Sequence, residues 1–173
     1  IQSLTLSNDT DQFGAMRWPA MGEVTRITNP ITIDHTLLRQ YLLPGLFRLL
    51  ASNRHHDLPQ AVYELGTVVR DHTNSDRFAF LVAEQNGGFA AVRGRIQAIM
   101  RDLGASEYSI EPLGGDMGPW LAGRAAKVLV NGIHVGCFGE MDPHVGHHYE
   151  LKVPLSGAEF DVKELERALP DPV

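Results

Sequence analysis

The sequence predicts an α+β fold with a mixed, mostly antiparallel sheet flanked by helices. Two observations lead to this prediction. One segment near the start of the chain has apolar residues at helical spacing, and several β-rich runs separated by tight turns follow it. Strand-like and helix-like segments alternate too irregularly for a doubly wound fold. With 173 residues and no internal repeat, the chain is expected to form one domain over residues 1–173.

The first quarter of the chain contains signals for short elements only. Leu4 and Leu6 have polar neighbours and indicate a short strand. The polar residues 7–9 can cap a brief helix that reaches Met16. Residues 24–28 indicate a second strand, which Asn29-Pro30 would stop.

The clearest helical pattern follows. Its apolar side chains recur every three or four positions, whereas Arg48 falls on the opposite face. Pro44 lies inside the pattern, and a proline is tolerated only in a first turn or at a kink. The helix is therefore expected to begin near Gln40 or Tyr41 and to end at about Arg54.

Strand signals dominate the rest of the chain. Two apolar runs flank Asn131-Gly132, and Asn-Gly readily takes the two positive φ angles of a type I′ turn. This predicts a hairpin from Ala125 to Phe138. Two further strands are expected at 61–69 and 78–83, and they are expected to pair with each other. The remaining strands are expected at 108–111 and 154–162, and helices at 89–103, 142–148 and 163–169. A loop is expected at 113–123 and a linker at 170–172.

Composition restricts the possible functions. The formal net charge is -6, whereas nucleic-acid binders carry a basic face, so RNA is not expected to bind mainly here. The single cysteine, Cys137, excludes an internal disulfide and argues against a cysteine-based zinc site, and it is expected to be a buried, inert thiol.

No apolar run approaches the about 20 residues that cross a membrane, and no signal peptide is evident, so a cytoplasmic location is expected. The first residue is Ile1, not methionine, which indicates a fragment of a longer chain.

Four charged residues beside apolar strands are candidates for a site. Glu64 and Glu140 interrupt apolar strands, and Arg70 and Arg124 flank strands as possible partners. Such a carboxylate could bind a metal, a substrate amine or an arginine, or it could face solvent on the polar side of its strand.

Two other features carry weaker signals. The pairs His55-His56 and His147-His148 are adjacent in sequence, and neighbouring helical positions point about 100° apart, so solvated helix ends are favoured over a metal site. The glycine-rich segments 114–118 and 136–139 match neither a phosphate loop nor a dinucleotide-binding unit. No metal ligand is predicted.

Several short motifs occur in a recognisable order along the chain. They are Asn29-Pro30-Ile31, Leu38-Arg39, Leu42-Leu43-Pro44-Gly45-Leu46, Asn53-Arg54-His55, Val62-Tyr63-Glu64-Leu65-Gly66, Gly123-Arg124-Ala125-Ala126, Asn131-Gly132, Val135-Gly136 and Gly139-Glu140-Met141-Asp142-Pro143. From about Ser3 to Leu169 the sequence resembles the β chain of phenylalanyl-tRNA synthetase. Because the chain ends soon after Leu169, it resembles the archaeal and eukaryotic type.

The resemblance implies a C-terminal core domain with a class II aminoacyl-tRNA synthetase-like fold that has lost its catalytic site. The family's second class II motif has an arginine shortly before the glutamate, and Val62-Tyr63-Glu64 has none. Arg124 is the nearest candidate for the arginine of the third motif, without its glycine-rich helix. The resemblance therefore implies no catalytic residue in this domain.

The resemblance also implies partners. The helix from Tyr41 to Arg54 corresponds to the first class II motif, which forms an interface, and an (αβ)2 heterotetramer with the catalytic α chain is expected. The residues expected to contact the α chain are Leu42, Leu43, Pro44, Leu46, Phe47 and Leu50.

No cofactor is expected in this domain, and ATP and magnesium are implied for the whole enzyme. Transfer RNA is expected to contact mainly other domains, although local basic patches could still touch it. The arginines of these patches are Arg48, Arg54, Arg93, Arg95 and Arg101.

Two alternatives to the scaffold hypothesis remain open. A free-standing class II synthetase paralogue would retain amino-acid or ATP binding, using Glu64, Arg70, Arg124 and Glu140. A metal-dependent hydrolase would use the histidine pairs.

Overall fold

The structure is a computed structural model that describes residues 1–114 and 118–169. Its centre is a six-stranded sheet in which every neighbouring pair is antiparallel. The α+β class is confirmed, and the expected mixed sheet is wholly antiparallel over the described residues. Across the sheet, the strands are β3 (Gln60–Arg70), β4 (Thr73–Ala83), β8 (Leu155–Asp161), β7 (Ile133–Met141), β6 (Trp120–Val130) and β5 (Tyr108–Pro112).

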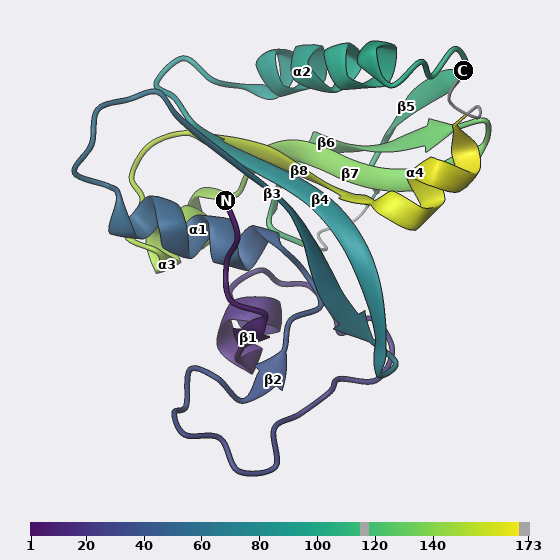
Figure 1. Ribbon diagram of the computed structural model, residues 1–173. Helices are drawn as coiled ribbons and strands as arrows, with labels where there is room; N and C mark the ends of the chain where they lie inside the picture. The colour runs from purple at the N-terminus through teal and green to yellow at the C-terminus, as the bar shows by residue number, and fades with distance from the viewer. Residues whose placement is uncertain (115–117, 170–173) are drawn as a thin grey trace.

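Helices cover both faces of this sheet (Figure 1). One face packs against α1 (Leu43–Ser52) and α3 (Pro143–His148), and the other against α2 (Phe89–Asp102) and α4 (Val162–Ala168). Each face has its own hydrophobic core, one with α1 and one with α2 and α4. None of the helices in the described part of the chain is long and apolar enough to span a membrane.

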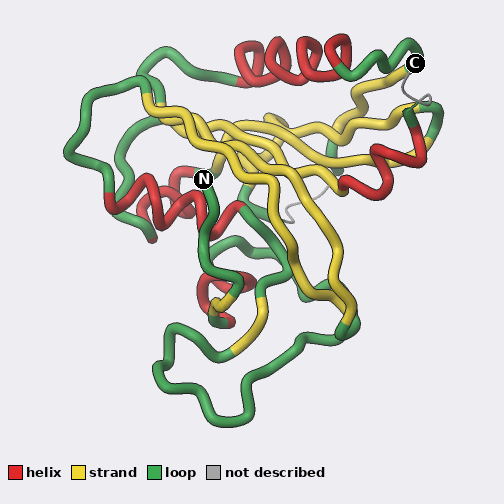
Figure 2. The backbone as a smooth tube through the Cα atoms, in the orientation of Figure 1, coloured by secondary structure: helices red, strands yellow, loops and turns green. Residues whose placement is uncertain are grey.

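The N-terminal segment forms a small lobe below the sheet (Figure 2). It contains β1 (Leu6–Ser7), the single turn η1 (Thr10–Gly14) and β2 (Leu37–Leu38). The first strand and the brief helix were predicted, and β2 was not. The strand predicted at 24–28 is wrong, because Arg26 makes only an isolated bridge to Leu37 before the chain diverges into a loop.

The predicted pair of strands after α1 is confirmed, and both strands are longer than expected. The turn has only two residues, Asp71 and His72, both with positive φ. Residues 73–76, which lie outside the two expected strands, belong to β4 because they pair with 67–70, and the Thr67 hydroxyl donates to Asp76 Oδ1 at 2.7 Å.

Most of the remaining elements lie where the sequence places them. β5, α2, α3, β8 and α4 agree with their predicted ranges within one residue at each end. The loop predicted at 113–123 is wrong at its end, since β6 begins at Trp120 and a register shift follows before Ala125. Part of that loop and of the glycine-rich segment 114–118, and the predicted linker at 170–172, lie outside the described residues.

The Asn131-Gly132 turn gives a testable contrast between two glycines. Asn131 and Gly132 have φ angles of 50° and 79°, as a type I′ turn requires. Gly132→Ala should lower the free energy of unfolding by about 1 kcal/mol, because alanine is strained there. Gly94→Ala should raise it by about 0.5–1 kcal/mol, since Gly94 lies within α2 and an added Cβ meets nothing within 4 Å. Urea unfolding measures both, and equal effects would contradict the assigned turn.

Candidate functional site

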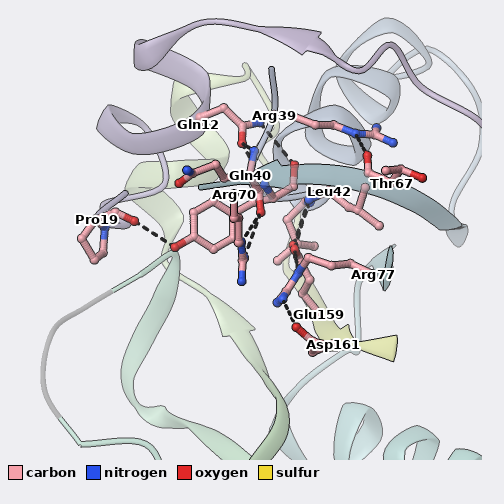
Figure 3. A network of polar contacts seen from close by, with 12 residues as sticks. Gln12, Pro19, Arg39, Gln40, Leu42, Thr67, Arg70, Arg77, Glu159 and Asp161 are labelled. Atoms are coloured by element: carbon pink, nitrogen blue, oxygen red, sulfur yellow. Dashed lines mark hydrogen bonds and ion pairs between the residues drawn. The ribbon is translucent and has the colours of Figure 1, made fainter. Parts of the chain in front are cut away.

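A buried carboxylate lies where α1 meets the sheet (Figure 3). Glu159, on β8, is 2% exposed. It accepts hydrogen bonds from the backbone N–H groups of Leu42 and Leu43, each at 3.1 Å, and from Arg77 Nε at 2.6 Å. The N-terminal amides of a helix need acceptors, and a negative charge there suits the helix dipole. Glu159 therefore fixes the start of α1 on the centre of the sheet.

Arg77 extends this contact to a second helix. It lies on β4, is 9% exposed, and has Asp161 Oδ2 as a further partner at 3.4 Å. Asp161 in turn accepts a hydrogen bond from the Glu164 backbone N–H at 3.1 Å and so caps α4. One chain of polar contacts thus joins α1, β8, β4 and α4. Figure 3 shows this chain from Leu42 to Asp161.

Gln12 and Arg70 hold the segment that leads into α1. The Gln12 side-chain oxygen accepts from the N–H groups of Gln40 and Tyr41 at 2.8 and 2.9 Å. Arg70 donates to the Gln40 carbonyl through Nε at 3.2 Å and Nη2 at 2.9 Å, and its guanidinium lies 5.1 Å from the centre of the Tyr41 ring. The contacts of Arg70 with the Gln40 carbonyl and with the Tyr41 ring therefore hold the chain in place ahead of α1.

Burial changes the proton affinity of two of these groups. It lowers the pKa of Arg70, and the charge of Arg77 lowers this pKa further. Burial also raises the pKa of Tyr41 to about 12, so that its hydroxyl stays protonated and donates to the Pro19 carbonyl at 2.9 Å.

A second buried ion pair lies on β3. Glu64 is 0% exposed and lies 2.9 Å from Arg39 Nη1. The Ser3 hydroxyl donates to Glu64 at 2.6 Å, and Arg39 Nε donates to the Thr67 carbonyl at 2.9 Å. Of the alternatives that the sequence left open for Glu64, the structure shows binding to an arginine, and the carboxylate does not face solvent because Ser3 and Arg39 fill the space around it.

The four charged candidates from the sequence do not form one site. Glu140 contacts α2, where it accepts from the Phe89 N–H at 2.6 Å, so it lies on the opposite face of the sheet from Glu64. Arg124 is 3.7 Å from Glu140, and of the four candidates, whose pairing the sequence left open, these are the two that the fold brings together. Among the described residues, the Gln40 carbonyl is the one hydrogen-bond acceptor for Arg70.

The expectation that the apolar face of α1 contacts a partner needs correction. All six predicted residues are buried inside this chain, since the α1 side of the sheet needs its own cover. Arg48 and Ser52 lie on the exposed side of the helix. While α1 stays folded on the sheet, a partner cannot reach these six side chains, which are Leu42, Leu43, Pro44, Leu46, Phe47 and Leu50.

Sequence inspection missed the central residues of this network. Glu159 interrupts the apolar run of β8 in the same way that Glu64 interrupts β3, so the same signal was present for both. Its partner Arg77 is 82 positions away in sequence, and local patterns do not reveal such a pair.

Within the described part of the chain the histidine pairs belong to no metal-binding group, and the cysteine lies beside a different histidine, with Cys137 Sγ 3.4 Å from His134 Nε2. Over residues 1–114 and 118–169, no three His, Cys, Asp or Glu side chains are grouped closely enough to hold a metal ion. His55 and His56 are exposed and lie against each other, with ring centres 4.3 Å apart. Cys137 is half-buried, and burial raises its pKa to about 11. Its thiol therefore stays protonated near neutral pH and is a poor nucleophile.

The Glu159 contact predicts a large effect on stability. Glu159→Gln removes the charge that pairs with Arg77 and caps α1, and it should lower the free energy of unfolding by about 3 kcal/mol. The matched control is Asp9→Asn, which breaks the exposed pair between Asp9 and Arg26 and should cost less than about 1 kcal/mol. Both values come from urea titration at neutral pH. Equal costs would show that Glu159 does not anchor α1.

The raised pKa of Cys137 predicts that its thiol reacts slowly with a disulfide reagent. Its pKa lies about two units above the ordinary value of 9.0, so at pH 8 the folded chain should react with a disulfide reagent about a hundredfold more slowly than the chain in denaturant. The rate should rise as the pH approaches 11 and the thiolate forms. A fast reaction at pH 8 in the folded chain would show that the thiol is not shielded.

The sequence is similar to three archaeal proteins named phenylalanine–tRNA ligase beta subunit. It is 36% identical over 162 residues to the protein of Methanothrix thermoacetophila, 33% over 175 residues to that of Methanopyrus kandleri and 35% over 164 residues to that of Archaeoglobus fulgidus. The alignments cover 94%, 97% and 92% of this chain, and 29% of each relative. The chain thus spans about three-tenths of the length of these curated relatives.

A family model also matches residues 2–162, and its description is phenylalanyl tRNA synthetase beta chain CLM domain. The match confirms the β chain resemblance. It assigns the CLM domain, where the sequence had led us to expect a C-terminal class II core. On the extent of this match and the identity to its relatives, the chain belongs to the CLM domain family of phenylalanyl-tRNA synthetase β chains.

Proposed function

We propose that this domain is a non-catalytic scaffold within a phenylalanine–tRNA ligase. In this proposal the β chain supports a catalytic α chain that activates phenylalanine with ATP and charges tRNA. The relatives are named as beta subunits of that ligase, which supports a role beside another subunit.

The observation that carries the proposal is the internal pairing of the charged groups around α1. Arg39 pairs with Glu64 and Arg77 pairs with Glu159, while Arg70 is bound to a backbone carbonyl. Binding a triphosphate requires arginines whose donors are free to make bidentate contacts. In this network the donors stabilise the fold instead.

The proposal also includes the fold of the domain, the assembly of the enzyme and the place of its ligands. Residues 1–173 would form one catalytically degenerate, class II-like domain, and a six-stranded antiparallel sheet with helices on both faces is compatible with that fold. The assembly would be an (αβ)2 heterotetramer in the cytoplasm. ATP, magnesium and most tRNA contacts would belong to the rest of the enzyme. Because the apolar face of α1 is buried, the α chain would contact other surfaces of the domain.

Three measurements on full-length chains test this role. Sedimentation of a mixture should show the β chain associated with the α chain, and the β chain alone should show no ATP–pyrophosphate exchange. Arg124→Gln in the β chain should leave aminoacylation by the complex unchanged, because Arg124 is exposed and only approaches Glu140. Exchange activity in the β chain alone, lost in Arg124→Gln, would contradict the scaffold and favour a synthetase paralogue.

A further inference from the structure

An apolar loop projects from the N-terminal lobe, away from the six-stranded sheet (Figure 1). Ile31 and Ile33 lie on this loop, and their side chains are 101% and 87% exposed. These are the highest exposed fractions among the large apolar side chains of the described residues. Single exposed apolar residues are common in folded proteins, but two that project together form a surface that gains from being covered by a partner.

The base of the loop is fixed to the lobe. Arg26 and Leu37 form an antiparallel bridge, and the Ile27 N–H donates to the Thr36 carbonyl at 2.9 Å. The Arg26 guanidinium also donates two hydrogen bonds to the Asp9 carboxylate, at 2.8 and 2.7 Å. These contacts hold the two ends of the loop together, so its tip is presented at a defined place.

The tip is also stiff for its length. Residues 28–33 are Thr-Asn-Pro-Ile-Thr-Ile, and four of these six side chains are β-branched. Branching at Cβ restricts χ1, and Pro30 fixes its own φ angle. A segment with few accessible conformations loses little entropy when a partner orders it. The loop is therefore suited to being the inserted part of an interface.

The charge pattern of the loop indicates what kind of partner would cover it. Residues 27–33 include no charged residue. Charges lie around the base instead, in the pair of Asp9 and Arg26 and in Asp34, which lies 3.8 Å from Arg48 of α1. An apolar centre with a polar rim is typical of a protein–protein interface, whereas a nucleic acid would require basic side chains. The partner is thus a protein with an apolar pocket.

We propose that this loop inserts Ile31 and Ile33 into an apolar pocket of the catalytic α chain. The inference rests on the scaffold role proposed above and identifies the contact surface for it. The relatives are named as beta subunits, and such names indicate a partner subunit. The apolar side of α1 is buried, but its exposed side carries Arg48, which lies beside Asp34 of the loop. The loop and the exposed side of α1 therefore form one continuous surface for the α chain.

Association of the full-length chains tests this inference. The double variant Ile31→Ser/Ile33→Ser removes both apolar side chains from the tip. Leu103→Ser is the control, because Leu103 is 43% exposed at the C-terminal end of α2. In sedimentation, the double variant should bind the α chain at least about tenfold more weakly than the unaltered β chain, and the control should bind as the unaltered chain does. Urea unfolding of both variants should match that of the unaltered chain, since the replaced side chains lie in solvent.

Maleimide labelling of the full-length β chain identifies what covers the loop. Ile31→Cys places a thiol at the tip, and Leu103→Cys places the control at the end of α2. In the β chain alone, both thiols should react at similar rates. Addition of the α chain should slow labelling at position 31 at least about tenfold and leave labelling at position 103 unchanged.

Three results would overturn the proposal. Protection of position 31 in the β chain alone would mean that another part of the β chain, or a second copy of it, holds the tip. A double variant that binds the α chain as tightly as the unaltered chain would show that the tip makes no contact, and would leave the scaffold role standing. If the unaltered chains do not associate, the scaffold role fails together with the loop contact.

Discussion

The position of α1 depends on one buried negative charge. A carboxylate taken out of water is costly unless donors surround it, and removing one partner of a buried pair is strongly destabilising. Glu159 has three donors, two from the start of α1 and one from Arg77. Because β8 lies between β4 and β7, this carboxylate is near the middle of the sheet. The helix is therefore held at the centre of one face, and its apolar side closes the core beneath it.

This arrangement has a consequence for the chemistry available to the domain. Glu64 on β3 and Glu159 on β8 are both buried, and each is matched to one arginine. The backbone groups leading into α1 are bound by Gln12 and Arg70. Polar groups that satisfy one another in the folded chain would have to exchange these contacts to hold a ligand. The interior of this face is thus better suited to rigidity than to binding a highly charged substrate.

The sequence could predict the features that depend on neighbouring residues, but not the contacts between residues far apart in the chain. The Asn131-Gly132 hairpin and the helices α1 and α2 were identified because turn chemistry and helical periodicity act over a few residues. The family resemblance rested on ordered motifs and is confirmed. The partner of Glu64 was not identified, because Arg39 comes from outside β3. Nor could periodicity show that the apolar face of α1 is covered by its own chain, since a buried face and an interface have the same pattern.

The two faces of the sheet therefore differ in how much of their apolar surface is buried by residues of this chain. On the α1 face the apolar residues are buried, and the charges within the network are matched by residues of the same chain. On the α2 face the core continues to an exposed tyrosine and leucine on β3. Covering the exposed apolar side chains on the α2 face would remove apolar surface from water, whereas the charges on the α1 face are already paired and gain nothing from being covered. The helix that the sequence marks as an interface is part of the core, and the edge strand β3 beside it exposes apolar side chains to solvent.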